Sequence, residues 1–356
     1  MAVFQVPEGF PTIQAAVNAA RPGDTVKVAS GFFSEDVIVP AEKARLRIEG
    51  GGSLETILLG PGSTGIGFTL NGTTDVEIIG FGIQGFSSIG ILVNGGTNTV
   101  IKDVAIENSP IGIWLTNTAF TCVVEKSQIS HTSYALPVGP GTEHALITHN
   151  WIHDNTHGVT TFINSHRVQV VNNRFSKNIL GVESVLSRQT LILNNDFDGD
   201  LVAVCLRTAA DFNRCVENHL TGDDYDVAVI SSSFAQIMGN VMAAGFGGGV
   251  TLIGSNSNQV LQNRIEGKGG SGVRIEGSNN NEIEDNQVLS NSANGIRLLG
   301  TSTGNVVREN FLWSNAPFDI NDHSTGANTF DRNDCQTSRP PEICRHSGIW
   351  QLEVDP

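Results

Sequence analysis

The sequence predicts an all-β fold, a single right-handed parallel β-helix of about eleven coils of 22–24 residues, closed by an N-terminal helix and a C-terminal tail. Two observations predict this fold. Asn recurs at a nearly fixed interval through most of the chain, and apolar residues recur at fixed offsets from each Asn. The composition agrees, because 40 Gly residues and a charged fraction of 16% are typical of strands and tight turns rather than helices.

The interval is set by a column of Asn residues. Its members are Asn173, Asn195, Asn218, Asn240, Asn263, Asn286 and Asn310, continued by Asn333 and, toward the N-terminus, by Asn150, Ser127, Asp103 and Gly80. A second column, in the C-terminal half, contains Asn258, Asn281, Asn305 and Asn328. Asn tolerates left-handed turn geometry, and its amide can hydrogen-bond to the equivalent Asn one coil away. Each column therefore predicts a stacked turn.

Apolar residues accompany the first column on both sides. Three positions earlier lie Val100, Val124, Ile147, Val170, Ile192, Cys215, Ile237, Val260, Ile283, Val307 and Phe330, and two positions later lie Ala105, Ile129, Ile152, Phe175, Phe197, Leu220, Met242, Ile265, Val288 and Leu312. A period this short cannot hold two helices, and the coils lack the Leu residues of leucine-rich repeats. The coils are therefore predicted to be short strands that stack about 4.8 Å apart.

The two ends of such a rod need covers, because uncovered edge strands invite association. Residues 12–20 place Ile13, Ala16 and Val17 on one helical face, with Thr12 as the expected N-cap. The tail is expected to lie across the last coil through Ile349, Trp350 and Leu352. The predicted boundaries are 1–30 for the N-terminal cap and first strand, 31–334 for the β-helix and 335–356 for the C-terminal cap.

Net charge and hydropathy restrict the partners. The formal net charge of −15 excludes nucleic acid, whose phosphates require a basic surface. An acidic surface also repels polyanions, so a neutral glycan is easier to accept unless a cation bridges the two. No stretch approaches the roughly 18 apolar residues of a membrane-spanning helix, so membrane insertion is not expected. Residues 1–7 lack the features of a secretory signal.

The five cysteines divide into two groups. Cys122, Cys205 and Cys215 lie within strand patterns, whereas Cys335 and Cys344 lie nine residues apart in the tail. The latter two could close a small loop, which would imply an oxidising location; two free thiols in a reduced compartment are the alternative.

The opening segment, FPTIQAAVNAARPGDTVKVASGFFSEDVIV, is followed by repeats of the form N-x-I-x-x-N…G-I-x-L. Together they resemble the pectin-lyase-like superfamily, specifically bacterial proteins with parallel β-helix repeats, over nearly the whole chain. The resemblance implies the fold. It leaves activity open, because that superfamily includes lyases, hydrolases, esterases, epimerases, phage adhesins and noncatalytic surface proteins. The sequence contains no polygalacturonase-type N-T-D, pectin-esterase-type D-F-I-F-G or mannuronan-epimerase-type D-P-H pattern.

Candidate site residues follow from the alternation of the second strand in each coil. In enzymes that the fold resembles, the active residues project outward from one lateral sheet and the turn before it. Glu183 and Arg207 should then project on neighbouring coils, with His157 at the mouth of the same strand. Asp200 and Asp223 occupy equivalent turn positions and should stack about 5 Å apart, a spacing that suits a retaining glycosidase pair and raises the pKa of one carboxyl.

Other residues near these turns have weaker claims. Asp224 flanks the acid pair. For Asp200, Asp223 and Asp224 the alternative is a purely structural role, because Asp is a common turn residue. The run NNDFDGDL suggests a calcium-loop fragment with ligands Asp196, Asp198 and Asp200, although it lacks the distal Glu. Six of the nine histidines fall within two coils: His131, His144, His149, His153, His157 and His166. Apart from the role expected for His157, the alternatives are solvent-facing positions in longer turns and a zinc-type site.

Two functions are compatible with these features. The first is a polysaccharide-active enzyme, a lyase, hydrolase or epimerase, that needs no cofactor apart from an optional calcium ion and uses a lateral groove over residues 150–230. The second is a noncatalytic surface, spore-coat or adhesive rod. Its support is an outward apolar column that could form a homo-oligomer interface: Phe162, Val185, Ile230, Ile253 and Leu299. Either function suits an extracellular location or the cell or spore surface.

Overall fold

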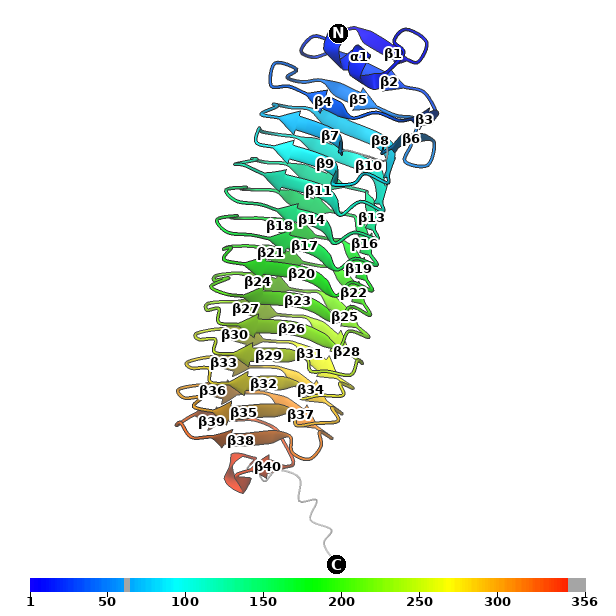
Figure 1. Ribbon diagram of the computed structural model, residues 1–356. Coiled ribbons are helices and arrows are strands. Elements are labelled where there is room, and N and C mark those ends of the chain that lie inside the picture. The colour runs from blue at the N-terminus through cyan, green and yellow to red at the C-terminus, as the bar shows by residue number, and fades with distance from the viewer. Residues whose placement is uncertain (61–64, 345–356) are drawn as a thin grey trace, which may run out of the picture.

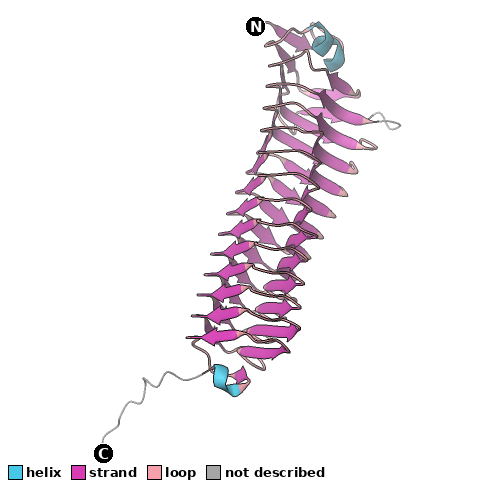
Figure 2. Cartoon of the chain, turned by 90° about the vertical axis from the view of Figure 1, so that its left-hand side faces the viewer, coloured by secondary structure: helices cyan, strands magenta, loops and turns pink. Residues whose placement is uncertain are grey.

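The chain folds as one long parallel β-helix. The computed structural model describes residues 1–60 and 65–344, which stack as a rod with the N-terminal helix at one end (Figures 1 and 2). Strands pair in parallel with the equivalent strand of the next coil, as Val170 does with Ile192 and Ile192 with Cys215. Two sheets result, one of 26 strands and one of 14. The predicted fold class is confirmed.

Each typical coil contributes two strands to the larger sheet and one to the smaller. The first ladder of the larger sheet contains β1 (Val3–Val6), β2 (Thr25–Val28), β5 (Arg47–Glu49), β8 (Glu77–Gln84), β10 (Val100–Glu107), β12 (Val123–Glu125), β15 (Leu146–Thr148), β18 (Gln169–Val171), β21 (Leu191–Leu193), β24 (Arg214–Val216), β27 (Gln236–Met238), β30 (Gln259–Leu261), β33 (Glu282–Glu284), β36 (Val306–Arg308) and β39 (Thr329–Asp331). The second ladder contains β3 (Gly31–Phe33), β6 (Thr56–Leu59), β13 (Gln128–Ser130), β16 (Trp151–His153), β19 (Arg174–Ser176), β22 (Asp196–Asp198), β25 (His219–Thr221), β28 (Val241–Ala243), β31 (Arg264–Glu266), β34 (Gln287–Leu289) and β37 (Phe311–Trp313). Strands β8 and β10 run through both ladders.

The smaller sheet forms the lateral face on which the candidate site was predicted. Its members are β4 (Val37–Val39), β7 (Ile66–Asn71), β9 (Ile89–Asn94), β11 (Ile111–Thr116), β14 (Tyr134–Val138), β17 (His157–Thr161), β20 (Leu180–Val185), β23 (Val202–Arg207), β26 (Tyr225–Ile230), β29 (Val250–Ile253), β32 (Val273–Glu276), β35 (Ile296–Gly300), β38 (Ile320–Ser324) and β40 (Ser338–Arg339). One strand per coil gives 14 coils where the sequence predicted about eleven. The extra coils lie toward the ends of the chain, where the turns lack the Asn signal.

Both ends are covered in the described part of the chain. Helix α1 (Ile13–Ala19) buries Ile13, Ala16 and Val17 against the first coil, and the Thr12 side chain accepts a hydrogen bond from the Ala15 amide, as predicted for an N-cap. It is too short to span a membrane, and no other helix among the described residues has the required length and hydropathy.

At the C-terminal end, β40 pairs with β38 and a 3₁₀ turn, η1 (Pro341–Ile343), follows. Cys335 and Cys344 form a disulfide, with Cα atoms 5.2 Å apart, so the first of the two alternatives for these cysteines is the one observed. The predicted tail contacts of Ile349, Trp350 and Leu352 lie outside the described residues.

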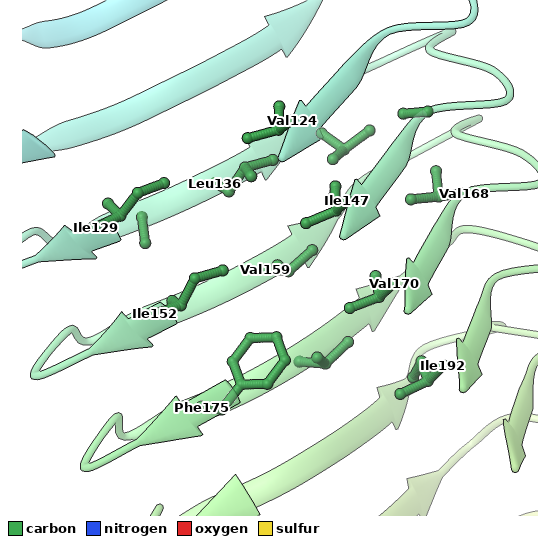
Figure 3. Close-up of a cluster of buried hydrophobic side chains, with 14 of the residues drawn as sticks. Val124, Ile129, Leu136, Ile147, Ile152, Val159, Val168, Val170, Phe175 and Ile192 are labelled. Carbon is green, nitrogen blue, oxygen red and sulfur yellow. The ribbon is translucent and has the colours of Figure 1, made fainter. Parts of the chain in front are cut away.

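The interior is lined by the predicted apolar columns. Val170, Ile192, Cys215 and Ile237 are all fully buried, and Figure 3 shows successive coils placing equivalent side chains one above another. Phe175 and Phe197 continue the second column, with ring centroids 4.8 Å apart. Burial at roughly 25 cal/mol per Å² of apolar surface makes these columns the main source of stability.

The register prediction was wrong by one residue near position 103. Ile101, not Val100, pairs with Val124 and is buried, and Ile106, not Ala105, pairs with Ile129. At the turn position itself the Val104 amide donates to Ser127 Oγ. With no Asn to mark the turn in β8 and β10, the interval counted back from Ser127 was one residue too long and gave Asp103 in place of Val104. At the other end, Phe330 is only partly buried.

The predicted Asn columns form hydrogen-bonded ladders. In the first, the Asn173 amide and Nδ2 both donate to Asn195 Oδ1, at 2.9 and 3.1 Å, and Nδ2 also donates to the Ile147 carbonyl. In the second, Asn281 Nδ2 donates to Asn305 Oδ1 at 2.9 Å. In the first ladder the left-handed backbone falls on the residue before the Asn, such as Asn172, rather than on the ladder Asn itself.

Removing one rung should destabilise the rod measurably. Asn218→Ala would leave the Asn195 amide donors and the Ile192 carbonyl without their partner, and buried unsatisfied groups cost about 1–3 kcal/mol each. We expect urea unfolding, followed by circular dichroism, to show a loss of about 2–4 kcal/mol. Gln287→Ala, at an exposed strand position, should change it by less than about 0.5 kcal/mol; equal effects would contradict a stabilising role for the ladder.

Candidate functional site

The outward face of the 14-stranded sheet carries one buried carboxylate. Glu183 lies between Thr160 and Cys205 in the strand register, while its neighbour in sequence, Val182, points into the core. Although it projects outward, Glu183 is only 1% exposed. Larger side chains from adjacent positions, His157 and Arg207, close over it.

Glu183 holds both of these neighbours by hydrogen bonds. Arg207 Nε donates to Glu183 Oε1 at 2.5 Å, and His157 Nδ1 lies 3.1 Å from Oε2. The three residues come from three successive coils, in β17, β20 and β23. The predicted association of His157, Glu183 and Arg207 on this face is therefore present in the structure.

The environment of Glu183 keeps it ionised. Burial alone would raise the pKa of Glu183, but the hydrogen bonds from His157 and Arg207 outweigh burial and hold the pKa below its usual range. The same contact raises the pKa of Arg207. A fixed carboxylate beside Nδ1 favours the His157 tautomer that carries its proton on that nitrogen, which leaves Nε2 as a hydrogen-bond acceptor.

Aromatic rings fix the orientation of His157. The imidazole stacks on Tyr134, with centroids 4.3 Å apart and planes 9° apart, and Tyr134 in turn contacts Phe162. The arrangement therefore combines a positioned base, an anion, a guanidinium and aromatic surface on one patch, which is the equipment for binding a polar ligand and moving a proton.

The predicted acid pair does not face this patch. Asp200 and Asp223 are 1% and 0% exposed and lie inside the rod. They belong to a third ladder that the sequence did not reveal, in which Asn155, Asn178, Asp200 and Asp223 occupy one turn position. The Asn178 amide donates to Asp200 Oδ1 and the Asp200 amide to Asp223 Oδ1, so each Asp replaces an Asn and points inward as that Asn would.

Asp200 and Asp223 lie on neighbouring coils, as predicted, but their side chains point into the rod rather than outward. Burial is the main cause of a pKa of about 7 for Asp200 and about 8 for Asp223, with the Asp200 charge adding to the shift at Asp223. The second oxygen of each carboxyl, Oδ2, has no hydrogen-bond partner. Side chains enclosed in this way cannot touch a ligand on the outer face. Asp224, next in the chain, is partly exposed.

The predicted calcium ligands do not converge. Asp196 and Asp198 project outward from β22, whereas Asp200 points inward. Asp196 instead lies 3.2 Å from His219 Nδ1. Within residues 1–60 and 65–344, no group of three or more His, Cys, Asp or Glu side chains is arranged to hold a metal ion.

A groove on the larger sheet was not predicted. It has a volume of about 670 Å³ and is lined by His149, Trp151, Arg174, Asp196 and His219 together with ladder Asn residues. Arg174 lies 5.6 Å over the Trp151 ring, which is 40% exposed. The outward alternation of β16, β19, β22 and β25 was the available signal, but the predicted site lay on the smaller sheet and its turns.

The outward apolar column is less exposed than a free surface would suggest. Phe162, Val185 and Ile230 are partly buried on the same face as Glu183, and Ile253 is 36% exposed. Val185, Ile230 and Ile253 share one register column with Arg207.

Two family models match the chain. Residues 62–197 match the model described as "Right handed beta helix region", and residues 185–338 match the model described as "Periplasmic copper-binding protein (NosD)". Together they span most of the coils. A comparison with curated protein sequences finds no match.

Solved structures resemble the fold at low sequence identity. The A-module of the mannuronan C-5 epimerase AlgE4 from Azotobacter vinelandii aligns at 13% identity over 92% of this chain and 94% of its own, with a TM-score of 0.61. DFA-IIIase from Arthrobacter chlorophenolicus A6 aligns at 14% identity over 82% and 94%, with a TM-score of 0.61. The catalytic unit of the GH87 α-1,3-glucanase from Streptomyces thermodiastaticus aligns at 12% identity over 91% and 66%, with a TM-score of 0.55.

Proposed function

Because this chain has the right-handed parallel β-helix fold and resembles the pectin-lyase-like superfamily, we propose that it binds and processes a glycan on the outward face of its 14-stranded sheet. The structural neighbours named above include enzymes named for polysaccharides, a mannuronan epimerase and an α-1,3-glucanase. That fold-level likeness supports a carbohydrate as the ligand class but does not identify the reaction.

The observation that carries the proposal is the His157–Glu183–Arg207 contact. A buried carboxylate fixed to Nδ1 orients the imidazole so that Nε2 can accept a proton from a ligand on the outer face. Arg207 is 45% exposed at its side chain, so part of its guanidinium can still meet a hydroxyl, ring oxygen or carboxylate of the ligand.

The reaction class follows from the number of carboxylates available. Hydrolysis with retention needs two carboxyl groups about 5 Å apart at the sugar, and the predicted partners Asp200 and Asp223 are enclosed inside the rod. A histidine base beside a cation instead suits proton abstraction, as in a lyase or an epimerase. Asp224, which is partly exposed, is a candidate ligand contact near the site.

An extracytoplasmic location fits this function. One matching family model is described as periplasmic, and the Cys335–Cys344 disulfide is the kind of bond that oxidising compartments maintain.

Substitution of Glu183 tests the proposal. Glu183→Gln keeps the shape but removes the charge that orients His157, so we expect turnover of the responsive glycan to fall by about 10²-fold or more, as for loss of a group that positions a general base. The measurement is absorbance of unsaturated products, or exchange of solvent deuterium into the sugar, across a glycan panel. Arg274→Gln, on the same outward column four coils along, is the matched control and should leave turnover unchanged.

A negative outcome has a defined meaning. If no glycan in the panel binds or reacts, and light scattering instead finds a stable oligomer, the noncatalytic rod that packs through its apolar column becomes the better account. If glycans bind but Glu183→Gln binds and reacts as the unaltered protein does, the ligand occupies another face, and the groove beside Trp151 is then the first place to look.

A further inference from the structure

A lysine lies wholly inside the rod, in contact with an aspartate 42 residues earlier. The side chains of Lys268 and Asp226 are each 0% exposed, and Lys268 Nζ lies 2.8 Å from Asp226 Oδ1. A second contact, of 3.1 Å, joins Nζ to the carbonyl oxygen of Asp223. We propose that Lys268 and Asp226 become joined by an intramolecular amide bond, an isopeptide crosslink between two coils of the β-helix.

The turn sequence explains how the two side chains meet. Asp223, Gly245 and Lys268 occupy equivalent positions on three successive coils, since Lys268 donates its amide to Asn291 in the same ladder. Gly245 has no side chain, and a Cβ atom there would lie 2.7 Å from Lys268 Nζ. The lysine chain therefore extends through the space that a larger residue would fill and reaches the coil that contains Asp226.

On neighbouring coils, the residues at the position equivalent to Asp226 have small side chains or none. Gly158, Gly181 and Ala203 precede it in the strand register, and Gly249 follows it. A carboxylate in this column is therefore enclosed inside the rod, where the Asp226 side chain is 0% exposed. Its Oδ1 contacts Nζ while Oδ2 has no hydrogen-bond partner, so one oxygen is engaged with the amine and the other is free to leave.

Burial of Lys268 and Asp226 favours formation of the amide bond between them. Burial disfavours the charged forms of both an amine and a carboxyl, so transfer of a proton from Nζ to the Asp226 carboxylate across the 2.8 Å contact gives a neutral amine beside a neutral acid. Holding two such groups in contact replaces a bimolecular encounter with a step of high effective concentration. Asp223, whose Oδ2 is also unpartnered, lies beside them as a proton carrier.

The step balances without any co-reactant. The Nζ lone pair attacks Asp226 Cγ, a C–N bond forms, and one C–O bond breaks. The departing oxygen takes two protons, the second delivered through the Asp223 carboxyl, and leaves as water. The product is a secondary amide, so both interior charges disappear along with their desolvation cost.

The chain contains an internal control for this argument. Lys102 Nζ contacts Glu125 Oε1 at 2.7 Å, almost the same distance, but these side chains are 37% and 25% exposed. Water reaches both side chains there, so neither charge bears the desolvation cost of a buried pair. Contact alone would make the two pairs equally reactive, whereas enclosure predicts an amide at Lys268 only.

Mass spectrometry tests the crosslink directly. The intact, reduced, full-length protein should be lighter than its sequence by the mass of one water molecule. Digestion with trypsin and Glu-C together should then yield residues 218–264 joined to 267–274, with fragmentation that locates the branch at Asp226 and Lys268. The double digest is needed because either protease alone leaves adjoining peptides whose joined mass equals that of a missed cleavage.

Two variants, together with the position at which the water is lost, distinguish the crosslink from other losses of water. Lys268→Arg keeps the charge but cannot form this amide, and it should restore the full mass; Asp223→Asn should slow formation in freshly purified protein. A full-mass native protein would overturn the proposal and leave an ordinary buried ion pair. So would a water loss located elsewhere, for instance as a succinimide at Asp198–Gly199. Neither result depends on glycan turnover, so this proposal and the proposed function fail independently.

Discussion

Replacing Ile192 by Asp should prevent the protein from folding. Ile192 is fully buried in the first apolar column and pairs with Val170 and Cys215 on the neighbouring coils. A carboxylate there would be charged, unpaired and without hydrogen-bond donors, and we expect a loss on the order of 5 kcal/mol or more. Domains are commonly stable by only about 5–15 kcal/mol, so soluble expression should be lost or the far-ultraviolet circular dichroism should be that of an unfolded chain.

The adjacent residue provides the control. Leu191 belongs to the same strand but points outward and is only partly buried. Leu191→Asp introduces the same charge one residue away, and the protein should still fold with a change of about 1 kcal/mol or less. If both variants fold equally well, the inward and outward assignment of this strand is wrong.

Replacing Asp200 by Asn should stabilise the rod at alkaline pH. The new amide side chain would keep the acceptor that the Asn178 amide uses and would add a donor toward Asp223 Oδ1, as the ladder residues Asn155 and Asn178 have. It would also remove a buried carboxylate whose pKa burial raises to about 7. A pKa raised from about 4 to about 7 corresponds to roughly 4 kcal/mol, so we expect a gain of about 2–4 kcal/mol at pH 8 and above.

The sign of the pH dependence follows from the raised pKa. The folded protein holds a proton on Asp200 more tightly than the unfolded chain, whose Asp pKa is about 4. The associated stability is fully present below about pH 4 and is lost as the pH rises through about 7, the folded pKa. Asp200→Asn should therefore flatten the fall in unfolding free energy between these values, and its advantage should shrink at low pH.

Urea unfolding at several pH values measures this effect. Asp196→Asn removes a similar charge from an exposed position on the outer surface and should change stability by less than about 0.5 kcal/mol at any pH. A stabilising effect of Asp200→Asn that is independent of pH would mean that the added hydrogen bond, rather than the carboxylate, is responsible.

The repeat was predictable because the same physical requirement recurs in every coil. Each ladder Asn satisfies backbone donors that a buried turn would otherwise leave unpaired, so the Asn column and its apolar flanks appear in the sequence as a period. Where another residue meets that requirement, the period is lost. Near β8 and β10, the strand runs through the bend without an Asn, and the register there was assigned one residue away from its true place.

The site was only partly predictable for a related reason. Strand alternation located His157, Glu183 and Arg207 correctly, because outward and inward positions follow from period two. Turn residues obey no such rule. Asp200 and Asp223 were assigned outward because active residues project from this turn in enzymes that the fold resembles, whereas here they substitute for Asn in a ladder and point inward. Their spacing from Asn178 was present in the sequence but was masked by the change of residue type.

Gly245 interrupts the third ladder, because it has no side chain to form a rung. In a stacked repeat each coil is coupled only to its neighbours, so overall stability is a sum of intrinsic and nearest-neighbour terms, as in a one-dimensional Ising chain. The third ladder provides one such coupling at each step, and at Gly245 that coupling is missing. A single long side chain, Lys268, spans the missing link. Strand pairing and the first Asn ladder continue across this coil, so the missing rung weakens one nearest-neighbour coupling, which the Lys268 side chain replaces.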